Sequence, residues 1–86
     1  MKQLEKILKA VANKRRIAIL AFLKTKPEAT VGDISRHIKL SFTATSQHLG
    51  LLYRVDLVEK DQRSLEVYYS LARNQDRLVK NLLLEL

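Results

Sequence analysis

The sequence predicts a mainly helical domain that carries one small β-hairpin. Apolar residues recur at helical spacing through its first half, and an alternating pattern appears between residues 57 and 71. A chain of 86 residues allows one domain at most, so we expect a single domain over residues 1–86. The hydrophobic content of 47% is that of a globular chain and not of a disordered one. A chain this short buries a small core, and dimerisation is a common way to add buried surface.

Apolar stripes predict the first two helices. In the first helix, four residues follow the i, i+3, i+4, i+7 spacing: Leu4, Ile7, Leu8 and Val11. Asn13 is a suitable N-cap for the second helix, which ends before Pro27 because proline disfavours a helical residue in front of it. The residues expected to face inward from the second helix are Ile17, Leu20, Ala21 and Leu23.

Two further short helices are indicated by their caps. A short segment, residues 28–30, leads into the third helix, and Thr30 can cap it. Asp33 completes a start that resembles a capping box and places an acid near the positive end of the helix dipole. Its apolar side consists of Val31, Ile34 and Ile38. After a break at residues 39–41, Ser41 caps a fourth helix over about residues 42–55, whose inward residues are Thr45, Leu49 and Leu52.

The pattern changes from helical to alternating after the fourth helix. Residues 57–60 and 65–71 are expected to form strands, and residues 61–64 form the polar turn between them. A final helix is expected from about Ala72 to the end of the sequence. Two short helices joined by a tight turn and followed by a β-hairpin make a winged helix-turn-helix, in the order α-α-α-α-β-β-α.

The outward face of the fourth helix is suited to reading base edges in a DNA major groove. Its residues are short, small or polar: Thr43, Ala44, Ser46, Gln47 and Gly50. Gln can pair bidentately with adenine, hydroxyl groups reach bases or phosphates, and small residues let the helix sit close to DNA. The alternative is an ordinary solvated helix, but such a helix usually carries Glu and Lys, which this face lacks.

Basic residues occur in the wing and at the start of the chain, and the net charge is +7. Lys60 and Arg63 of the hairpin are suited to phosphates or a minor groove, although the adjacent Asp61 also fits a merely solvated turn. Residues 1–26 hold eight Lys or Arg against one Glu. The cations at residues 14–16 oppose the dipole of the second helix, which suggests a role beside flanking phosphates; the alternative is a solvated surface.

The combination of motifs resembles the ArsR-type repressor family. The resemblance covers nearly the whole chain and is carried by residues 8–20, 31–35, 40–49, 57–60 and 67–71 together with Leu52. It implies a homodimer that binds an imperfect inverted repeat in double-stranded DNA. It implies base contacts by Thr43, Ser46 and Gln47. Contacts with the DNA backbone or through the wing are assigned to Val31, Ser41, Lys60 and Arg63.

Departures from the family pattern concern recognition and sensing. Phe42 stands where the family often has Gln, so it either fills the core or touches a thymine methyl group, and Ser64 stands where a glycine commonly turns the wing. The chain has no cysteine for a thiolate metal site at the third helix. Asp76 and Glu85 are the possible oxygen ligands near the last helix, and His37 and His48 do not complete a site. We therefore predict a regulator that needs neither metal nor cofactor.

The dimer interface is expected on the first and last helices. The last helix is apolar on more than one side, and a leftover apolar surface usually marks an interface. The alternative is a slightly wide core stripe. The assigned interface residues are Leu4, Leu8, Leu82, Leu83 and Leu86.

The residue inventory excludes other classes of function. The sequence has no clustered carboxylates and no glycine-rich phosphate loop, and its two histidines are isolated. We therefore expect that the protein is not an enzyme. It has no signal-peptide core and no apolar run of membrane-spanning length, so a cytoplasmic protein without a membrane partner is expected. The interpretation is a sequence-specific DNA-binding transcriptional repressor. The alternative is a winged-helix protein-interaction module, which would present an acidic or apolar recognition face.

Overall fold

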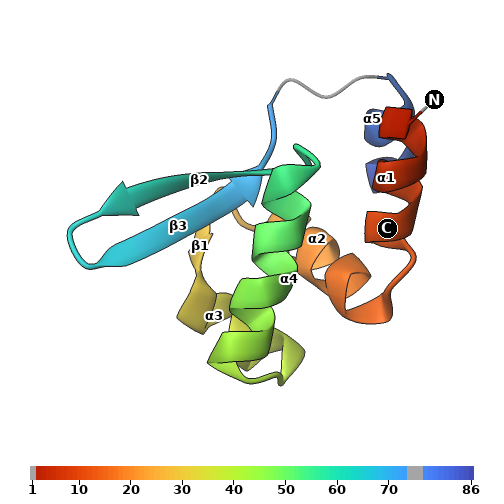
Figure 1. The fold of residues 1–86 in the computed structure, drawn as a ribbon. Helices are drawn as coiled ribbons and strands as arrows, with labels where there is room; N and C mark the ends of the chain where they lie inside the picture. Colours follow the sequence, from red (N-terminus) through yellow and green to blue (C-terminus); the bar gives the residue numbers. More distant parts are fainter. Residues whose placement is uncertain (1, 74–76) are drawn as a thin grey trace.

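The computed structural model describes residues 2–73 and 77–86, and within them it shows five helices around a three-stranded antiparallel sheet (Figure 1). The sheet order is β1-β3-β2. The elements are α1 (Lys2–Val11), α2 (Lys14–Thr25), β1 (Ala29–Thr30), α3 (Val31–Ile38), α4 (Phe42–Arg54), β2 (Val58–Arg63), β3 (Glu66–Leu71) and α5 (Arg77–Leu84). This arrangement confirms the mainly helical fold with a β-hairpin and the helix-turn-helix formed by α3 and α4.

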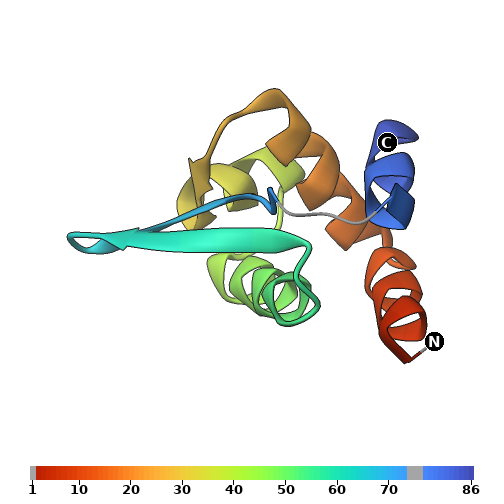
Figure 2. The same ribbon diagram turned by 90° about the horizontal axis from the view of Figure 1, so that it is seen from above.

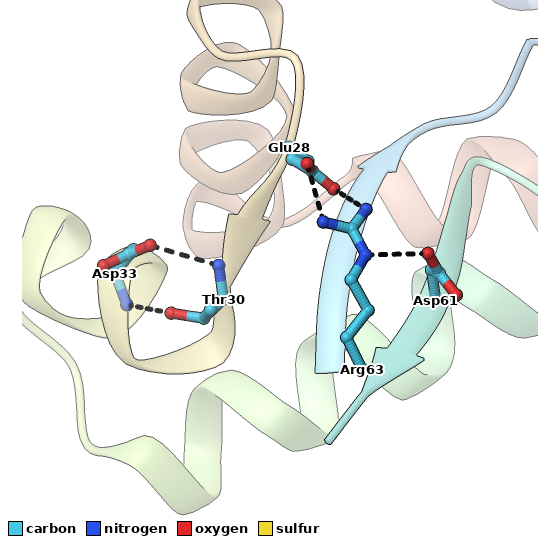
Figure 3. Close-up of polar contacts among 5 residues, drawn as sticks. All are labelled: Glu28, Thr30, Asp33, Asp61 and Arg63. Atoms are coloured by element: carbon cyan, nitrogen blue, oxygen red, sulfur yellow. Dashed lines mark hydrogen bonds and ion pairs between the residues drawn. The ribbon is translucent and has the colours of Figure 1, made fainter. Parts of the chain in front are cut away.

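The three helix caps expected from the sequence are present. Asn13 Oδ1 accepts from the backbone N–H groups of Arg15 and Arg16 at 3.0 and 3.1 Å. The Ser41 hydroxyl oxygen accepts from the backbone N–H of Ala44 at 3.1 Å. Thr30 and Asp33 form a full capping box, with backbone-to-side-chain distances of 3.1 and 3.2 Å (Figure 3). The bonds from Thr30 stabilise the Asp33 carboxylate and lower its pKa.

The sheet contains a strand that the sequence analysis described only as a connecting segment. β1 pairs with β3, with Ala29 opposite Tyr69 and Thr30 opposite Tyr68. The hairpin turn also differs from the expected position. β2 continues through Arg63, and the chain reverses at residues 64–65, where Ser64 has a left-handed φ of 56°. Because Ser64 accepts this conformation, β2 continues into the polar run 61–64 and the turn forms at the end of that run.

The core lies between α2, the helix-turn-helix and the sheet. The back of α4 is anchored as expected, since Thr45, Leu49 and Leu52 are fully buried. The prediction for Ile17 was wrong, because this side chain is 37% exposed. It lies at the end of α2 that borders α5, where it lines a small apolar hollow with Leu82. The inward residues of α2 are Ile19, Leu20, Phe22 and Leu23.

Helices α1 and α5 lie on the same side of the molecule, away from the tip of the wing (Figures 1 and 2). The expected start of the last helix near Ala72 was wrong, because this residue follows β3 in extended chain and its N–H donates to the carbonyl of Leu57 at 3.1 Å. Helix α5 begins at Arg77. Asp76, considered as a metal ligand, lies outside the described residues.

Candidate nucleic-acid interface

The front of α4 carries the three side chains assigned to base contacts. Thr43 and Gln47 are exposed and Ser46 is half-buried, while Thr45 and Leu49 between them are buried. Among residues 2–73 and 77–86, no side-chain hydrogen bond or ion pair engages the three front residues. Their donors and acceptors therefore remain available to a ligand.

The first turn of α4 presents an apolar side chain to solvent. Phe42 directly follows the cap residue Ser41 and is 61% exposed. Of its two expected roles, filling the core is therefore contradicted. The turn before the helix is set by Lys39, which has a left-handed φ of 57° and caps α3.

Val31 requires a correction. It is the first residue of α3, as expected, but its side chain is only 7% exposed and belongs to the core. The side chain packs inward because the pairing of β1 with β3 pulls the start of α3 against the sheet. The side chain therefore leaves little surface for contact with a DNA backbone.

The wing arginine is engaged inside the chain instead of projecting as a free cation. Both terminal nitrogens of Arg63 bond the carboxylate of Glu28, one of them at 3.0 Å, and its Nε donates to Asp61 at 2.9 Å (Figure 3). The guanidinium also lies 4.4 Å from the ring centroid of Tyr68. The hydrogen bonds that Arg63 donates to Glu28, and then to Asp61, raise the pKa of the guanidinium. Arg63 thus braces the hairpin against the segment before β1, and its contact with a phosphate stays a prediction.

Lys60, the other wing cation, lies over an aromatic ring. Its Nζ is 4.3 Å from the ring centroid of Tyr53, which is 41% exposed near the end of α4. Lys60 itself is exposed. A cation over the face of a ring is attracted by the ring quadrupole but keeps its outer hydrogens available. Lys60 therefore keeps hydrogen-bond donors available for a phosphate, whereas those of Arg63 are bound to carboxylates in this structure.

The arginines at the start of α2 bind the ends of other helices. Arg16 Nε donates to the carbonyl of Ala10, in the last turn of α1, at 2.6 Å. Arg15 Nη1 donates to the carbonyl of Ile38, at the end of α3, at 3.3 Å. Cations at helix C-termini satisfy unpaired carbonyls and complement the helix dipole. This pairing explains why two arginines follow Lys14 at the start of α2, and a role of these cations beside flanking phosphates stays a prediction.

The two histidines lie in different environments. His48 is half-buried on α4, with Nδ1 3.3 Å from Nη1 of Arg16. Burial, followed by the charges of Arg16 and Arg15, lowers the pKa of His48. His37 stacks on the ring of Phe22 at 4.1 Å between centroids. In the part of the chain that the structure describes, no three His, Cys, Asp or Glu side chains form a metal-binding group, and metal independence stays a prediction.

Apolar side chains are exposed on the terminal helices. Leu8 is 45% exposed and Leu86 38%, and both belong to the expected interface. Leu4 and Leu82 are half-buried. Leu83 requires a correction, because it is only 7% exposed and packs in the core. The sequence analysis did not assign Leu84 or Leu78 to this surface, and the two are 76% and 39% exposed. No helix within the described ranges has the length and apolar character needed to cross a membrane.

Known proteins are similar to this chain in sequence and in fold. Residues 13–60 match the model of the bacterial regulatory protein arsR family. Over 77 residues the chain is 39% identical to the transcriptional activator HlyU of Vibrio cholerae, a match that covers 90% of this chain and 70% of that protein. The solved HlyU structure from Vibrio cholerae has a TM-score of 0.84 and 36% identity, covering 98% of this chain and 87% of the HlyU chain.

Two further solved structures are similar along nearly the whole chain. One is the homodimeric winged helix-turn-helix DNA-binding domain of a possible ArsR-family regulator from Mycobacterium bovis, with a TM-score of 0.83 and 30% identity over 98% of this chain and 74% of that one. The other is the transcriptional repressor PagR of Bacillus anthracis, with a TM-score of 0.79 and 25% identity over 98% of this chain and 92% of that one. The chain therefore belongs to the arsR family of bacterial regulatory proteins, and it is a winged helix-turn-helix transcriptional regulator rather than an enzyme.

Proposed function

We propose that the chain binds an imperfect inverted repeat in double-stranded DNA as a homodimer and represses transcription there. The observation that carries this proposal is the front of α4, where polar side chains without charge and without internal partners stand on a helix whose back is fully buried. A helix built in this way fits a major groove, where donors and acceptors on base edges replace the water it loses.

The contacts divide into base readout and backbone positioning. Thr43, Ser46 and Gln47 are assigned to base edges, with Gln47 able to pair bidentately with adenine. Ser41 uses its oxygen to cap α4, but its hydroxyl hydrogen remains available to donate to a phosphate. Lys60 supplies the wing cation that is not bound to a carboxylate. Backbone contacts of this kind fix the register of the protein on DNA and leave sequence choice to α4.

The homodimer is proposed through α1 and α5. Leu4, Leu8, Leu82 and Leu86 are partly exposed on these elements and at the end of the chain. A similar domain from Mycobacterium bovis is described as homodimeric. Two copies related by a twofold axis would place their recognition helices about one DNA turn apart, which an inverted repeat matches.

Repression is proposed as the outcome of occupancy, since a dimer seated on a promoter excludes other proteins from the same DNA. Similar proteins include one named as an activator and one named as a repressor. We propose further that this regulator works without a metal ion and in the cytoplasm. A protein-interaction role is disfavoured because the front of α4 is neither acidic nor apolar along its length.

Selection of duplexes from a random pool tests the proposal. We expect enrichment of an inverted repeat, binding that weakens steeply as salt rises, and a dimer by sedimentation at micromolar concentration. A reporter whose promoter overlaps the selected repeat should be switched down by the protein. Failure to enrich any duplex at low ionic strength would overturn the proposal, whereas enrichment with activation of the reporter would overturn only the sign of regulation.

A further inference from the structure

The exposed ring of Phe42 has no role in the core and lies on the surface that the proposed function places against DNA. It is 61% exposed at the first residue of α4. The residues around it on the front of the helix are polar, including Ser46 one turn later. Removing an apolar side chain of this size from water is favourable, so its exposed position favours contact with an apolar partner.

The location of Phe42 narrows what that partner can be. The ring lines an open hollow between the start of α3, the first turn of α4 and the wing, together with Gly32, Arg36, Leu65 and Tyr68. Arg36 on this rim is ion-paired with Asp33 at 2.7 Å, so its charge is partly neutralised. The ring therefore faces the space between the recognition helix and the wing, which DNA would cross.

The chemistry of base edges offers one apolar feature in the major groove. Guanine, cytosine and adenine present hydrogen-bond donors and acceptors there, whereas thymine adds a C5-methyl group. A phenyl ring cannot satisfy a donor or an acceptor, but it can cover a methyl group. Residues i and i+4 of a helix are neighbours, so Phe42 would read a base pair adjacent to the one that Ser46 contacts.

We propose that Phe42 is a specificity-determining residue that packs against the methyl group of a thymine in each half-site. The inference rests on the proposed function and deepens it by naming one base of the operator and the group that is read. The amide or hydroxyl of a polar residue in this position would select a different base edge. The operator of this chain is therefore expected to differ, at that base pair, from the operators of family members with a polar residue here.

The test uses the full chain and a duplex selected by it from a random pool. Each thymine of the half-site is replaced in turn by deoxyuridine, which lacks only the methyl group. For the unaltered protein we expect one position per half-site at which this replacement weakens binding about fourfold, the size expected for one buried methyl group. Placing 5-methylcytosine in that position of a cytosine-substituted duplex should restore part of the affinity.

Two variants isolate the ring. Phe42→Ala should bind the thymine and deoxyuridine duplexes equally, while Leu65→Ala, which removes another exposed apolar residue from the same hollow, should keep the difference. Both side chains are largely exposed, so both variants should unfold at the temperature of the parent. Specific binding without any methyl-dependent position, or a methyl dependence that survives in Phe42→Ala, would overturn the inference and leave the proposed function standing. Failure to select any duplex would overturn the proposed function as well.

Discussion

The recognition helix and the wing are both exposed and polar, but they use their side chains in opposite ways. On the front of α4, Thr43 and Gln47 have no partner among the described residues of the chain. In the wing, Arg63 is held by two carboxylates and Lys60 lies over an aromatic ring. The difference teaches that charge alone does not identify a DNA-contacting residue. We expect a side chain that is already bonded inside the fold to stabilise the arrangement of its elements, and a side chain without an internal partner to be available for recognition.

The largest effect is expected at the anchored back of α4. Leu49→Ala removes a fully buried side chain and should lower the free energy of unfolding by about 2–5 kcal/mol, because it leaves a cavity that the core fills only in part. Denaturant or thermal unfolding measures this loss. Arg63→Ala in the wing is the comparison, and an equal loss there would show that the wing, too, is anchored like a core element.

The front of α4 should respond in binding and not in stability. Gln47→Ala is expected to cost about 1–3 kcal/mol of discrimination at one base pair, as removal of a bidentate base contact does. Its free energy of unfolding should stay within about 0.5 kcal/mol of the parent because the side chain is exposed. Titration of the selected duplex and of single-base variants measures both specificity and affinity. Unchanged specificity would remove Gln47 from the recognition surface.

At Gly50 a single substitution should change the stability of the fold and the affinity for DNA in opposite directions. A Cβ added there would meet nothing within 4 Å in this chain, and Gly inside a helix is less stable than Ala by about 1 kcal/mol. Gly50→Ala should therefore raise the free energy of unfolding by about 0.5–1 kcal/mol and weaken DNA binding, because the groove wall would occupy the open space. A gain in stability with full DNA affinity would show that DNA does not approach this face closely.

The two wing cations should differ in the salt dependence of DNA binding. Lys60→Gln should reduce the slope of log affinity against log salt by about 0.9, as loss of one phosphate contact does. Arg63→Gln should leave the slope unchanged, and its stability cost should be small because the ion pairs are exposed and screened by solvent. A reduced slope for Arg63→Gln would return this residue to the DNA contacts, in agreement with the sequence analysis.

The smallest effect concerns His48 on the inner flank of α4. Its folded-state pKa lies below the ordinary value of 6.5, so on acidification the unfolded state takes up the proton first. Stability should therefore be complete above about pH 7.5 and should decline as the pH falls through 6.5 toward the folded-state pKa. Melting temperatures between pH 8 and pH 5 should show a smaller decline for His48→Gln than for the parent. His37→Gln serves as the matched control, and equal declines in all three proteins would contradict the prediction.

Features that depend on neighbouring residues could be predicted from the sequence. The caps at Asn13, Thr30 and Ser41 each rest on a polar side chain within three residues of its backbone partner. The buried back of α4 followed from helical periodicity, since Leu49 and Leu52 had to share a face. The front of the helix then followed by exclusion, whereas the choice of Thr43, Ser46 and Gln47 as base contacts came from the resemblance to the ArsR-type family.

Features that depend on distant residues could not be predicted in this way. The strand β1 exists because residues 29–30 pair with β3 about forty positions later. The brace at Arg63 needs Glu28, which is 35 residues away, and no local pattern marks this pair. The burial of Leu83 and exposure of Leu84 depend on how α5 packs, and the apolar run in the sequence does not distinguish them. In each case a tertiary contact determines the structure, and the spacing of apolar residues along the sequence does not reveal that contact.

The short strand β1 has one further consequence for how such a protein can meet its target. Thr30 is at once a strand residue paired with Tyr68 and the cap of α3, so β1, which is hydrogen-bonded to the wing strand β3, continues directly into the helix-turn-helix. This shared residue ties the start of α3 to the hairpin, so we expect the separation between α4 and the wing to vary little. Bending a DNA site of this length costs about a few kcal/mol, so we expect the duplex to deform more readily than the protein. Operators whose sequences deform easily between the two contacts should consequently be preferred, even at base pairs that no side chain touches.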